Sequence, residues 1–488
     1  MYIAKMNIST ERFLLQKQNP FDKAIISHEI TYTFRELNNK VLETAQTLIE
    51  NGIQADDRIG IYSKNNVDFV ILVLALWQLS VIPVPINTRL TSSEIKEQLI
   101  QANCKGIFLH QNLKSEFSLS NINVIEFPFK TDERSHIQNK IELNLTDPAV
   151  IIFTSGSESK SKGVILSFES LFNSAINSNH LLRYTNSDRW LASLPFHHVG
   201  GFSIITRSLI YGIPLIIPDS LNHETIKKSI TEFQPTYISL VAAQLKQFIE
   251  DGIKPNVELK NCLLGGGYAD NELIKNAIDL GWPINKVYGS TETSSFVTAL
   301  LADEFIFKPN SAGRDVPSNK ILIVDENKKE LNQFEIGEVV VNSNNLMSGY
   351  LNSNETKNVL NDGYYFTGDL GYLDEDGYLF IVGRKNHLIS TGGENVNPKE
   401  VEDVLLQHPM ISEAAIFPLE DEKWGEIVAA AVVLENESSK ISDDEIKSFL
   451  KNRIAGFKIP KKIFFENQLP RTELGKVEKE KLIKRYML

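Results

Sequence analysis

Short apolar segments alternate with amphipathic ones through the first half of the chain, and this alternation limits the possible folds more than any other feature. The apolar segments have the length of buried strands and cover Arg58–Tyr62, Val81–Pro85, Gly106–Leu109, Ala149–Phe153 and Leu215–Ile217. Strands separated by helical segments are typical of parallel sheets with crossover helices. We therefore predict an α/β fold whose large N-terminal domain contains mixed and parallel sheets covered by helices.

The clearest helix is predicted for residues 33–52. Thr33 and Glu36 have the spacing of a capping box, in which each side chain bonds the backbone of the other residue. Gly52 suits the end of the helix, because glycine commonly follows the last turn. One apolar face is formed by Leu37, Val41, Ala45, Leu48 and Ile49.

The length of the chain and a change in its pattern indicate further units. A chain of 488 residues exceeds the roughly 100–200 residues of a typical domain. After about residue 305, strands joined by Asp-Gly turns are predicted at Lys320–Asp325, Gly337–Val341 and Gly377–Val382. Near the C-terminus we predict helices at Pro398–His408 and Asp443–Ile454 and strands at Ala414–Phe417 and Ile427–Leu434. These patterns predict a small β-barrel-like subdomain around residues 305–383 and a small α+β C-terminal domain.

Composition and charge exclude several classes of protein. The formal net charge of -12 argues against nucleic-acid binding, which uses a basic surface. The longest apolar stretch, Phe69–Trp77, is shorter than the roughly 20 residues of a membrane-spanning helix and predicts a buried helix followed by a buried strand. Cys104 and Cys262 stand far apart among apolar residues, which favours buried thiols over a disulfide. Residues 1–20 lack the apolar core of a signal peptide, so we expect a cytoplasmic protein without membrane insertion.

A segment rich in serine, glycine and lysine, residues 154–163, directly follows the predicted strand Ala149–Phe153. Its sequence is Thr-Ser-Gly-Ser-Glu-Ser-Lys-Ser-Lys-Gly. Small hydroxyl residues and glycines allow backbone amides to converge on an anion, and lysines add positive charge. The spacing does not match a Walker A loop. Taken alone, the segment fits a phosphate-binding loop and a flexible surface loop equally well.

Two further motifs place a carboxylate among hydroxyl residues. Residues 288–293, Tyr-Gly-Ser-Thr-Glu-Thr, contain Glu292, which could hold a hard cation such as Mg²⁺ or simply cap a helix. Residues 367–370, Thr-Gly-Asp-Leu, contain Asp369. An Asp at the end of a strand is suited to accept both hydroxyls of a ribose, although Asp is also common in turns.

The last two motifs lie towards the C-terminus. Residues 383–386 (Gly-Arg-Lys-Asn) precede residues 390–395 (Ser-Thr-Gly-Gly-Glu-Asn), and residues 470–476 end in Gly-Lys. No single motif is decisive, but the order and spacing of all five resemble those of the adenylate-forming superfamily. This superfamily comprises acyl-CoA synthetases, adenylation domains of peptide synthetases and luciferases. The resemblance covers nearly the whole chain, from Thr31 to Lys476.

The resemblance implies a two-domain enzyme that uses ATP, Mg²⁺ and coenzyme A. An N-terminal domain, residues 1–383, would bind ATP and a carboxylic acid. A C-terminal lid, residues 387–488, would pivot on a hinge at residues 384–386 that includes Asn386. One pose would form an acyl adenylate, and the other would admit coenzyme A. Contacts to coenzyme A are expected from Gly392, Gly393 and Glu394.

The same resemblance assigns the nucleotide contacts. Glu292 would bind Mg²⁺, while Lys162 and Lys476 would act on the phosphates, Lys476 in the first half-reaction only. Asp369 would bind the ribose, with Arg384 beside it. The other expected nucleotide contacts are Thr154, Ser155, Gly156, Ser157, Gly265, Gly266, Gly267, Tyr288, Gly289 and Thr291.

Within the superfamily, residues 190–212 most resemble the o-succinylbenzoate–CoA ligase family of menaquinone biosynthesis. Arg207 interrupts the apolar, helix-like run Gly201–Ile210, and a buried Arg needs an anionic partner. An aromatic dicarboxylic acid would supply one: one carboxylate reacts and the other pairs with Arg207, as an Arg here does in these ligases. The alternatives for Arg207 are a protein carboxylate as partner or a surface position. His198 would be a catalytic residue bordering the acyl pocket, or a structural histidine. The acid site would be completed by Gly201, Gly289 and Ser290.

The sequence also departs from the family pattern. In the phosphate loop Glu158 replaces a hydroxyl residue, Ser159 a glycine and Ser161 a proline, and we expect Glu158 to point outwards. Asn386 stands where an acidic residue is frequent. Three alternatives to the predicted ligase stay open: another acyl-CoA synthetase, a stand-alone adenylation enzyme that loads a carrier protein, and a nucleotide- or acyl-binding regulator without turnover. The oligomeric state also stays open and includes a homodimer or a larger assembly.

Overall fold

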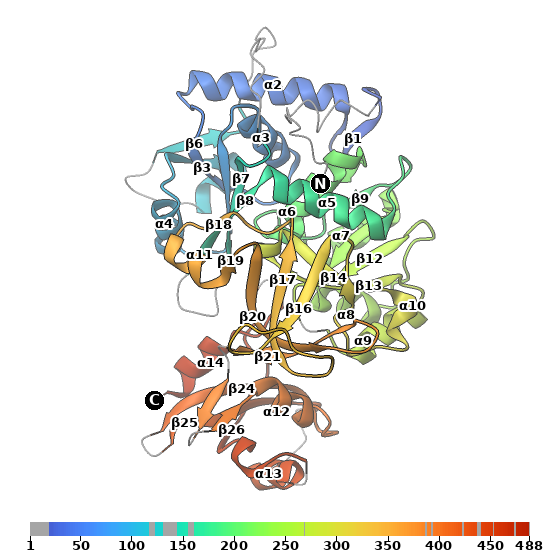
Figure 1. The fold of residues 1–488 in the computed structure, drawn as a ribbon. Helices are drawn as coiled ribbons and strands as arrows, with labels where there is room; N and C mark the ends of the chain where they lie inside the picture. The colour runs from blue at the N-terminus through green and yellow to red at the C-terminus, as the bar shows by residue number, and fades with distance from the viewer. Residues whose placement is uncertain are drawn as a thin grey trace.

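A large α/β body and a smaller C-terminal α+β unit make up the protein, as the computed structural model shows (Figure 1). The predicted fold class is confirmed. None of the helices in the described part of the chain is long and apolar enough to cross a membrane. The structure describes residues 19–116, 123–129, 144–154, 161–267, 269–385, 388–391, 394–421, 424–436, 441–451, 453–472 and 475–487.

The first sheet is entirely parallel, in the order β4-β3-β5-β6. It lies beside α2, and the capping box predicted for this helix forms: the Thr33 amide donates to Glu36 Oε2 at 2.8 Å, and the Glu36 amide donates to Thr33 Oγ1 at 3.3 Å. Three predicted strands are confirmed here to within one residue at each end. The elements are α2 (Phe34–Glu50), β3 (Arg58–Tyr62), α3 (Val67–Gln78), β4 (Ile82–Ile86), α4 (Ser92–Gln101), β5 (Gly106–His110), η1 (Gln111–Glu116) and β6 (Val124–Phe127).

The largest sheet has nine strands in the order β15-β14-β13-β12-β11-β9-β10-β1-β2. Its centre is parallel, and antiparallel strands lie at both edges. The strands are β1 (Lys23–Ile26), β2 (Thr31–Thr33), β9 (Trp190–Leu191), β10 (Leu215–Ile216), β11 (Tyr237–Leu240), β12 (Asn261–Leu264), β13 (Ile284–Ser290), β14 (Ser295–Leu300) and β15 (Arg314–Asp315). The helices between them are α5 (Phe168–Leu182), α6 (Val199–Tyr211), α7 (His223–Phe233), α8 (Ala242–Glu250), α9 (Asn271–Asp279), η2 (Thr291–Thr293) and α10 (Ala302–Phe305).

A three-stranded sheet, β18-β8-β7, corrects one expectation from the sequence. The segment 149–153 was predicted as one of the parallel strands, but β7 (Pro148–Thr154) pairs antiparallel with β8 (Lys162–Ser167). The few residues between these strands are too short for a parallel crossover, which needs about a dozen or more. The third strand, β18 (Gly349–Tyr350), joins β8 from far along the chain.

The predicted β-rich region contains an antiparallel sheet in the order β16-β17-β20-β19, and β21 pairs with the second half of β20. Its elements are β16 (Asn319–Val324), β17 (Gly337–Ser343), α11 (Ser353–Val359), β19 (Leu360–Asn361), β20 (Tyr364–Leu373) and β21 (Leu379–Arg384). The predicted Asp-Gly turns are present, since Asp362, Gly363 and Gly377 all have positive φ.

The C-terminal unit is built on a sheet in the order β23-β22-β25-β24, with β26 also pairing with β25. Its two predicted helices are present but end three residues early, because their last residues form turns instead. The elements are β22 (Ile389–Thr391), β23 (Glu394–Val396), α12 (Pro398–Leu405), β24 (Ile411–Asp421), β25 (Gly425–Leu434), α13 (Asp443–Lys451), η4 (Gly456–Lys458), β26 (Lys462–Phe465) and α14 (Lys479–Tyr486).

The Trp77 side chain packs between the first sheet region and the two helices α5 and α6. The Trp77 side chain is 1% exposed, and its Nε1 donates to the carbonyl of Ala149 on β7 at 2.7 Å. Its ring meets Phe168 of α5 and Phe202 of α6 edge-on, with centroids 5.3 and 6.0 Å away. The predicted buried helix and strand at 69–85 are therefore confirmed as part of a core that also positions α6.

We expect Trp77→Phe to lower the free energy of unfolding by about 1–3 kcal/mol, because the Ala149 carbonyl loses its donor and a cavity remains. Urea unfolding measures this loss. Trp424, which is 40% exposed, provides a matched control. Trp424→Phe should change the free energy by less than about 0.5 kcal/mol, so equal effects of the two variants would contradict this account.

Candidate active site

Asp369 lies at the centre of a hydrogen-bonded group that joins β13, β20 and β21. Its Oδ1 accepts a hydrogen bond from Arg384 Nε at 2.6 Å, and its Oδ2 accepts one from the Tyr288 hydroxyl at 2.7 Å. The prediction of a strand-end Asp was wrong, because Asp369 lies within β20 and faces Arg384 across the antiparallel pair β20–β21. Strand register thus brings the carboxylate and the guanidinium together.

The protonation states of this group are set by its burial and by its own charges. Burial raises the pKa of Tyr288 well above its usual value, and the nearby charge of Asp369 raises it further, so the phenol stays a donor. Burial alone would lower the pKa of Arg384, but the charge and hydrogen bond of Asp369 raise it overall. Each Asp369 oxygen still has a free acceptor position, which fits the predicted binding of ribose hydroxyls.

The predicted adenine-pocket glycines follow β12, next to Tyr288 on the neighbouring parallel strand β13. Gly266 has a φ of +84°, a conformation that favours glycine. A Cβ on Gly265 would lie 2.9 Å from Val287, whereas one on Gly267 would meet nothing within 4 Å. Gly289 lies so close to β14 that a Cβ there would be 2.0 Å from the Ser295 carbonyl oxygen. These positions leave backbone, rather than side chains, facing the pocket.

Lys476 belongs to the C-terminal unit, yet its amine lies near Arg384 and Asp369. It follows a tight turn in which the Gly475 amide donates to the Thr472 carbonyl at 2.9 Å. A Cβ on Gly475 would lie 3.4 Å from Ala243 of α8, so the turn packs against the large body. The protein around the Lys476 amine and then Arg384 lower its pKa, while Asp369 opposes this. The structure therefore has a pose in which Lys476 lies near Arg384 and Asp369, two of the predicted nucleotide contacts.

The predicted phosphate-binding residues lie on two adjoining elements. Thr154 and Lys162 face each other at the open end of the β7–β8 pair. Thr291 and Glu292 form the short helix η2 after β13, and the Glu292 side chain is 9% exposed. The remaining predicted loop residues lie outside the described residues: Ser155, Gly156, Ser157, Glu158 and Ser159.

Two buried tyrosines that the sequence analysis did not select contribute to this region. The Tyr350 hydroxyl donates to Glu292 Oε1 at 2.8 Å. Burial raises the pKa of Tyr365 well above its usual range, and the charge of Glu292 raises it further. Both tyrosines come from the β-rich region, so their closeness to Glu292 depends on contacts between segments far apart in the chain. The dipeptide Gly-Tyr at 349–350 was the only local indication.

Arg207 lies inside the large body on α6 and is 2% exposed. The guanidinium lies over the ring of Trp190, with its carbon 5.6 Å from the ring centroid, and over the ring of Phe296 at 5.0 Å. Its Nε and Nη2 atoms are buried and have no hydrogen-bond partner, and no carboxylate in the described part of the chain pairs with it. Two alternatives for Arg207, a surface position and a protein carboxylate as partner, are therefore not what this structure shows.

The unpaired nitrogens of Arg207 form one edge of the guanidinium plane. The guanidinium lies near two aromatic rings, which stabilise a cation through their π electrons. Nε–H and Nη2–H point the same way and are the pair that holds a carboxylate through two parallel hydrogen bonds. Burial lowers the pKa of Arg207, although a guanidinium stays charged. The interior of the large body thus contains a fixed cation whose carboxylate-binding edge is buried and unpaired.

The other predicted acid-site residues lie at the start of α6 and at the end of β13. His198 precedes the first residue of α6 and is half-buried. Gly201 packs so tightly that a Cβ would lie 2.1 Å from the Pro195 carbonyl oxygen, so it shapes the start of the helix. The Ser290 hydroxyl oxygen is buried without a hydrogen-bond partner.

The residues expected to contact coenzyme A and to form the hinge are mostly outside the described residues. Asn386, Gly392 and Gly393 belong to that group. Glu394 is exposed at the start of β23, where it pairs with Thr391 of β22. Their roles stay predictions.

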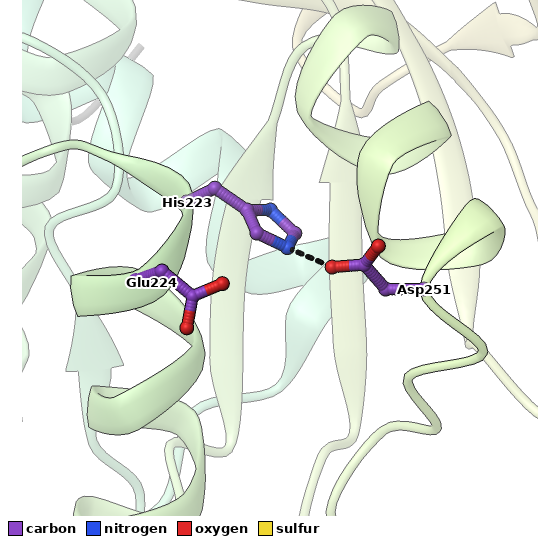
Figure 2. A group of neighbouring side chains, drawn as sticks. All are labelled: His223, Glu224 and Asp251. Carbon is purple, nitrogen blue, oxygen red and sulfur yellow. Dashed lines mark hydrogen bonds and ion pairs between the residues drawn. The ribbon is translucent and has the colours of Figure 1, made fainter.

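A separate cluster on the outer helices has the composition of a metal site. His223, Glu224 and Asp251 join the start of α7 to the end of α8 (Figure 2). His223 Nε2 and Asp251 Oδ2 are 2.7 Å apart, and the imidazole packs on Phe248 with ring centroids at 4.7 Å. The buried Nδ1 has no hydrogen-bond acceptor. Metal binding through Nε2 would place a proton on this unpartnered Nδ1, whereas metal-binding histidines normally donate this proton to an acceptor. The cluster is better explained as a hydrogen bond between two helices.

The fold and the site define an enzyme that activates a carboxylic acid with ATP. The chain belongs to the AMP-binding enzyme family, whose model matches residues 15–351, and the AMP-binding enzyme C-terminal domain matches residues 400–476.

Relatives with known names point to one branch of this family. The chain is 34% identical to 2-succinylbenzoate–CoA ligases of Bacillus cereus (strain AH820) and Bacillus thuringiensis subsp. konkukian over 470 residues, covering 95% of each protein. The o-succinylbenzoate CoA synthetase of Bacillus subtilis, solved with the acyl-adenylate intermediate, matches with a TM-score of 0.87 and 31% identity over 96% of this chain and 97% of that one.

The backbone similarity is not confined to the succinylbenzoate enzymes. ATP-bound MatB from Rhodopseudomonas palustris has the same TM-score of 0.87 at 25% identity, covering 98% of this chain and 99% of that one.

The lowered pKa of Lys476 leads to a prediction about pH. If the charged amine stabilises the phosphates, kcat/KM for adenylation should decrease as pH rises through a value below 10.5, the ordinary lysine pKa. Lys476→Arg should move this decrease to higher pH, because a guanidinium keeps its charge. Pyrophosphate exchange measured across pH tests this, with Lys461→Arg as the control. The same alkaline decrease in wild type and Lys476→Arg would rule out Lys476 as its source.

Proposed function

We propose that the protein joins o-succinylbenzoate to coenzyme A, with ATP cleaved to AMP and pyrophosphate, as a step of menaquinone biosynthesis. The relatives named above support the reaction, and the buried, unpaired edge of Arg207 is the observation that carries the choice of acid. A fully buried, unpaired cation is expensive for a folded protein. A substrate with a second carboxylate would remove that cost each time it binds.

Binding would place the acid between Arg207 and the nucleotide. The carboxylate on the aromatic ring or on the succinyl chain would occupy the Arg207 edge, and the other would face the phosphates. Monocarboxylic acids would leave the buried guanidinium unpaired and bind more weakly.

In the first half-reaction, an oxygen of the free carboxylate attacks the α-phosphorus of ATP. The new oxygen–phosphorus bond gives the acyl adenylate, and the bond to the departing pyrophosphate breaks. Because anions are brought together, the protein contributes mainly position and positive charge. Lys476 and Arg384 would supply charge near the ribose and α-phosphate, and Lys162 would do so near the departing pyrophosphate.

In the second half-reaction, the sulfur of coenzyme A attacks the acyl carbon and AMP leaves. The present pose suits the first step, since Lys476 occupies the nucleotide-binding side. Admission of coenzyme A would require the C-terminal unit to move, so that Gly392, Gly393 and Glu394 approach instead.

Glu292 fits the expected Mg²⁺ site. Mg²⁺ prefers carboxylate oxygens together with phosphate oxygens. Tyr350 orients one Glu292 oxygen, and the other accepts no hydrogen bond from the described residues. Bound there, Mg²⁺ would neutralise charge on the phosphates.

We also place the protein in the cytoplasm, where ATP and coenzyme A are available. Cys104 and Cys262 are free thiols, and burial raises the pKa of Cys104 to about 12, which keeps it unreactive. A homodimer or larger assembly is compatible with this function.

Arg207→Met provides the sharpest test of the proposed substrate. It should reduce kcat/KM for o-succinylbenzoate by roughly 30- to 1,000-fold, because a buried charge-assisted bond is lost. The same change should raise the free energy of unfolding of the unliganded protein by about 1–3 kcal/mol, since an unpaired buried charge is removed. AMP and thioester formation, followed by mass spectrometry, and urea unfolding measure the two effects.

Arg189→Met is the matched control. Arg189 Nε donates to the Phe233 carbonyl at 2.8 Å, so this Arg already has a protein partner. Its loss should lower stability and leave activity on o-succinylbenzoate unchanged. Benzoate, octanoate and several amino acids serve as alternative acids. Turnover of only one of these would keep the adenylation chemistry and discard o-succinylbenzoate, and no AMP from any acid would favour a binding protein without turnover.

A further inference from the structure

The short strand β18 links the two halves of the predicted triphosphate site, although none of the sequence motifs includes it. The Met347 amide donates to the carbonyl of Glu292 at 2.7 Å. One residue further, the Ser348 amide donates to the Ile165 carbonyl of β8 at 2.9 Å. The segment Met347–Leu351 therefore bridges η2, which carries Glu292, and β8, which begins with Lys162.

The segment and β8 are in close contact. The Leu351 amide donates to the Gly163 carbonyl at 2.9 Å. A Cβ on Gly163 would lie 2.3 Å from Leu351 Cδ1, so the Leu351 side chain packs directly on this glycine. Gly349 has a φ of +149°, and a Cβ there would meet Thr356 at 2.9 Å. The backbone contacts of this segment thus fix the position of the Tyr350 Cα and the direction of its side chain.

Tyr350 places its side chain between the carboxylate and the lysine. Its hydroxyl donates to Glu292 Oε1 at 2.8 Å, and Lys162 Nζ lies 5.7 Å from the centroid of its ring. The residue is 8% exposed. Burial raises the pKa of Tyr350 far above its usual range, and the charge of Glu292 raises it further, so the hydroxyl remains a donor.

We propose that Tyr350 is a positioning residue for the triphosphate site, which fixes the Glu292 carboxylate through its hydroxyl and Lys162 through its ring. A carboxylate with one oxygen held by a phenol presents the other oxygen in a defined direction. The partial negative charge of an aromatic ring face attracts a lysine ammonium group and so restricts its position. The inference rests on the proposed use of ATP and Mg²⁺ and does not depend on which acid is activated.

Tyr350→Phe tests this directly, because it keeps the ring and removes only the hydroxyl. Binding of Mn²⁺–ATP, measured by electron paramagnetic resonance without any acid, should weaken by about 5- to 20-fold, as expected when a hydrogen bond to a charged group is lost. The Mg²⁺ concentration for half-maximal pyrophosphate exchange should rise by a similar factor. Thioester formation from supplied acyl adenylate should stay within about twofold of wild type, since that step does not use the triphosphate.

Tyr378→Phe is the matched control, because Tyr378 is also 8% exposed and its hydroxyl donates to Glu304 at 3.0 Å, away from the site. It should leave Mn²⁺–ATP binding unchanged. Unchanged Mn²⁺–ATP binding and Mg²⁺ dependence in Tyr350→Phe would overturn the inference, and so would equal losses in both half-reactions, which would indicate a general structural role. Failure of the wild-type protein to bind Mn²⁺–ATP would instead reject the proposed function itself.

Discussion

Two buried carboxylates, each held by a buried phenol, are the interaction on which the nucleotide site depends. Asp369 accepts from Tyr288, and Glu292 accepts from Tyr350. Ionised carboxylates are costly to bury unless they are hydrogen-bonded, and phenols in such surroundings keep their protons. The arrangement gives the site two oriented anions that can meet ribose hydroxyls and a cation. Positive charge lies beside both carboxylates, with Arg384 and Lys476 near Asp369 and with Lys162 over the ring of Tyr350, so an anionic nucleotide could bind despite the net charge of -12.

In the predicted acid site the buried charge is positive and has no anionic partner in the described part of the protein, unlike the two carboxylates. Arg207 is a cation without an anion, stacked near the rings of Trp190 and Phe296 and unpaired along one edge. In the proposed function, the unliganded protein would give up stability so that binding energy depends on the second carboxylate of the substrate. A pocket that hydrogen-bonds a group rejects acids lacking that group far better than an apolar pocket can reject a missing methylene. The unpaired charge of Arg207 would therefore both select dicarboxylic acids and lower the stability of the unliganded protein.

The local pattern of apolar, polar and capping residues was sufficient to predict many of the helices and strands. The capping box at Thr33–Glu36 and the strand at Arg58–Tyr62 lie where the sequence places them, because propensity and burial agree there. The errors concern pairing: 149–153 entered an antiparallel sheet, and Asp369 lies inside a strand rather than at its end. Arg207 was identified because a charge within an apolar run is visible in one segment. Tyr350 was not, since its importance comes from contact with Glu292, 58 residues earlier in the chain.

The position of Lys476 shows why the motifs are spread over the whole chain. The two half-reactions have different geometry but use the same pocket. At least one charged group would therefore belong to a part of the protein that can move away from the pocket. Lys476 is carried by a turn whose glycine packs on α8, and its pKa is lowered by surrounding protein and by Arg384. Docking therefore brings a positive charge towards another positive charge, which is unfavourable until phosphate lies between them. A bound nucleotide would thus stabilise this pose, and the departure of pyrophosphate would destabilise it. The charge of the bound phosphate groups would in this way set the order of the two half-reactions.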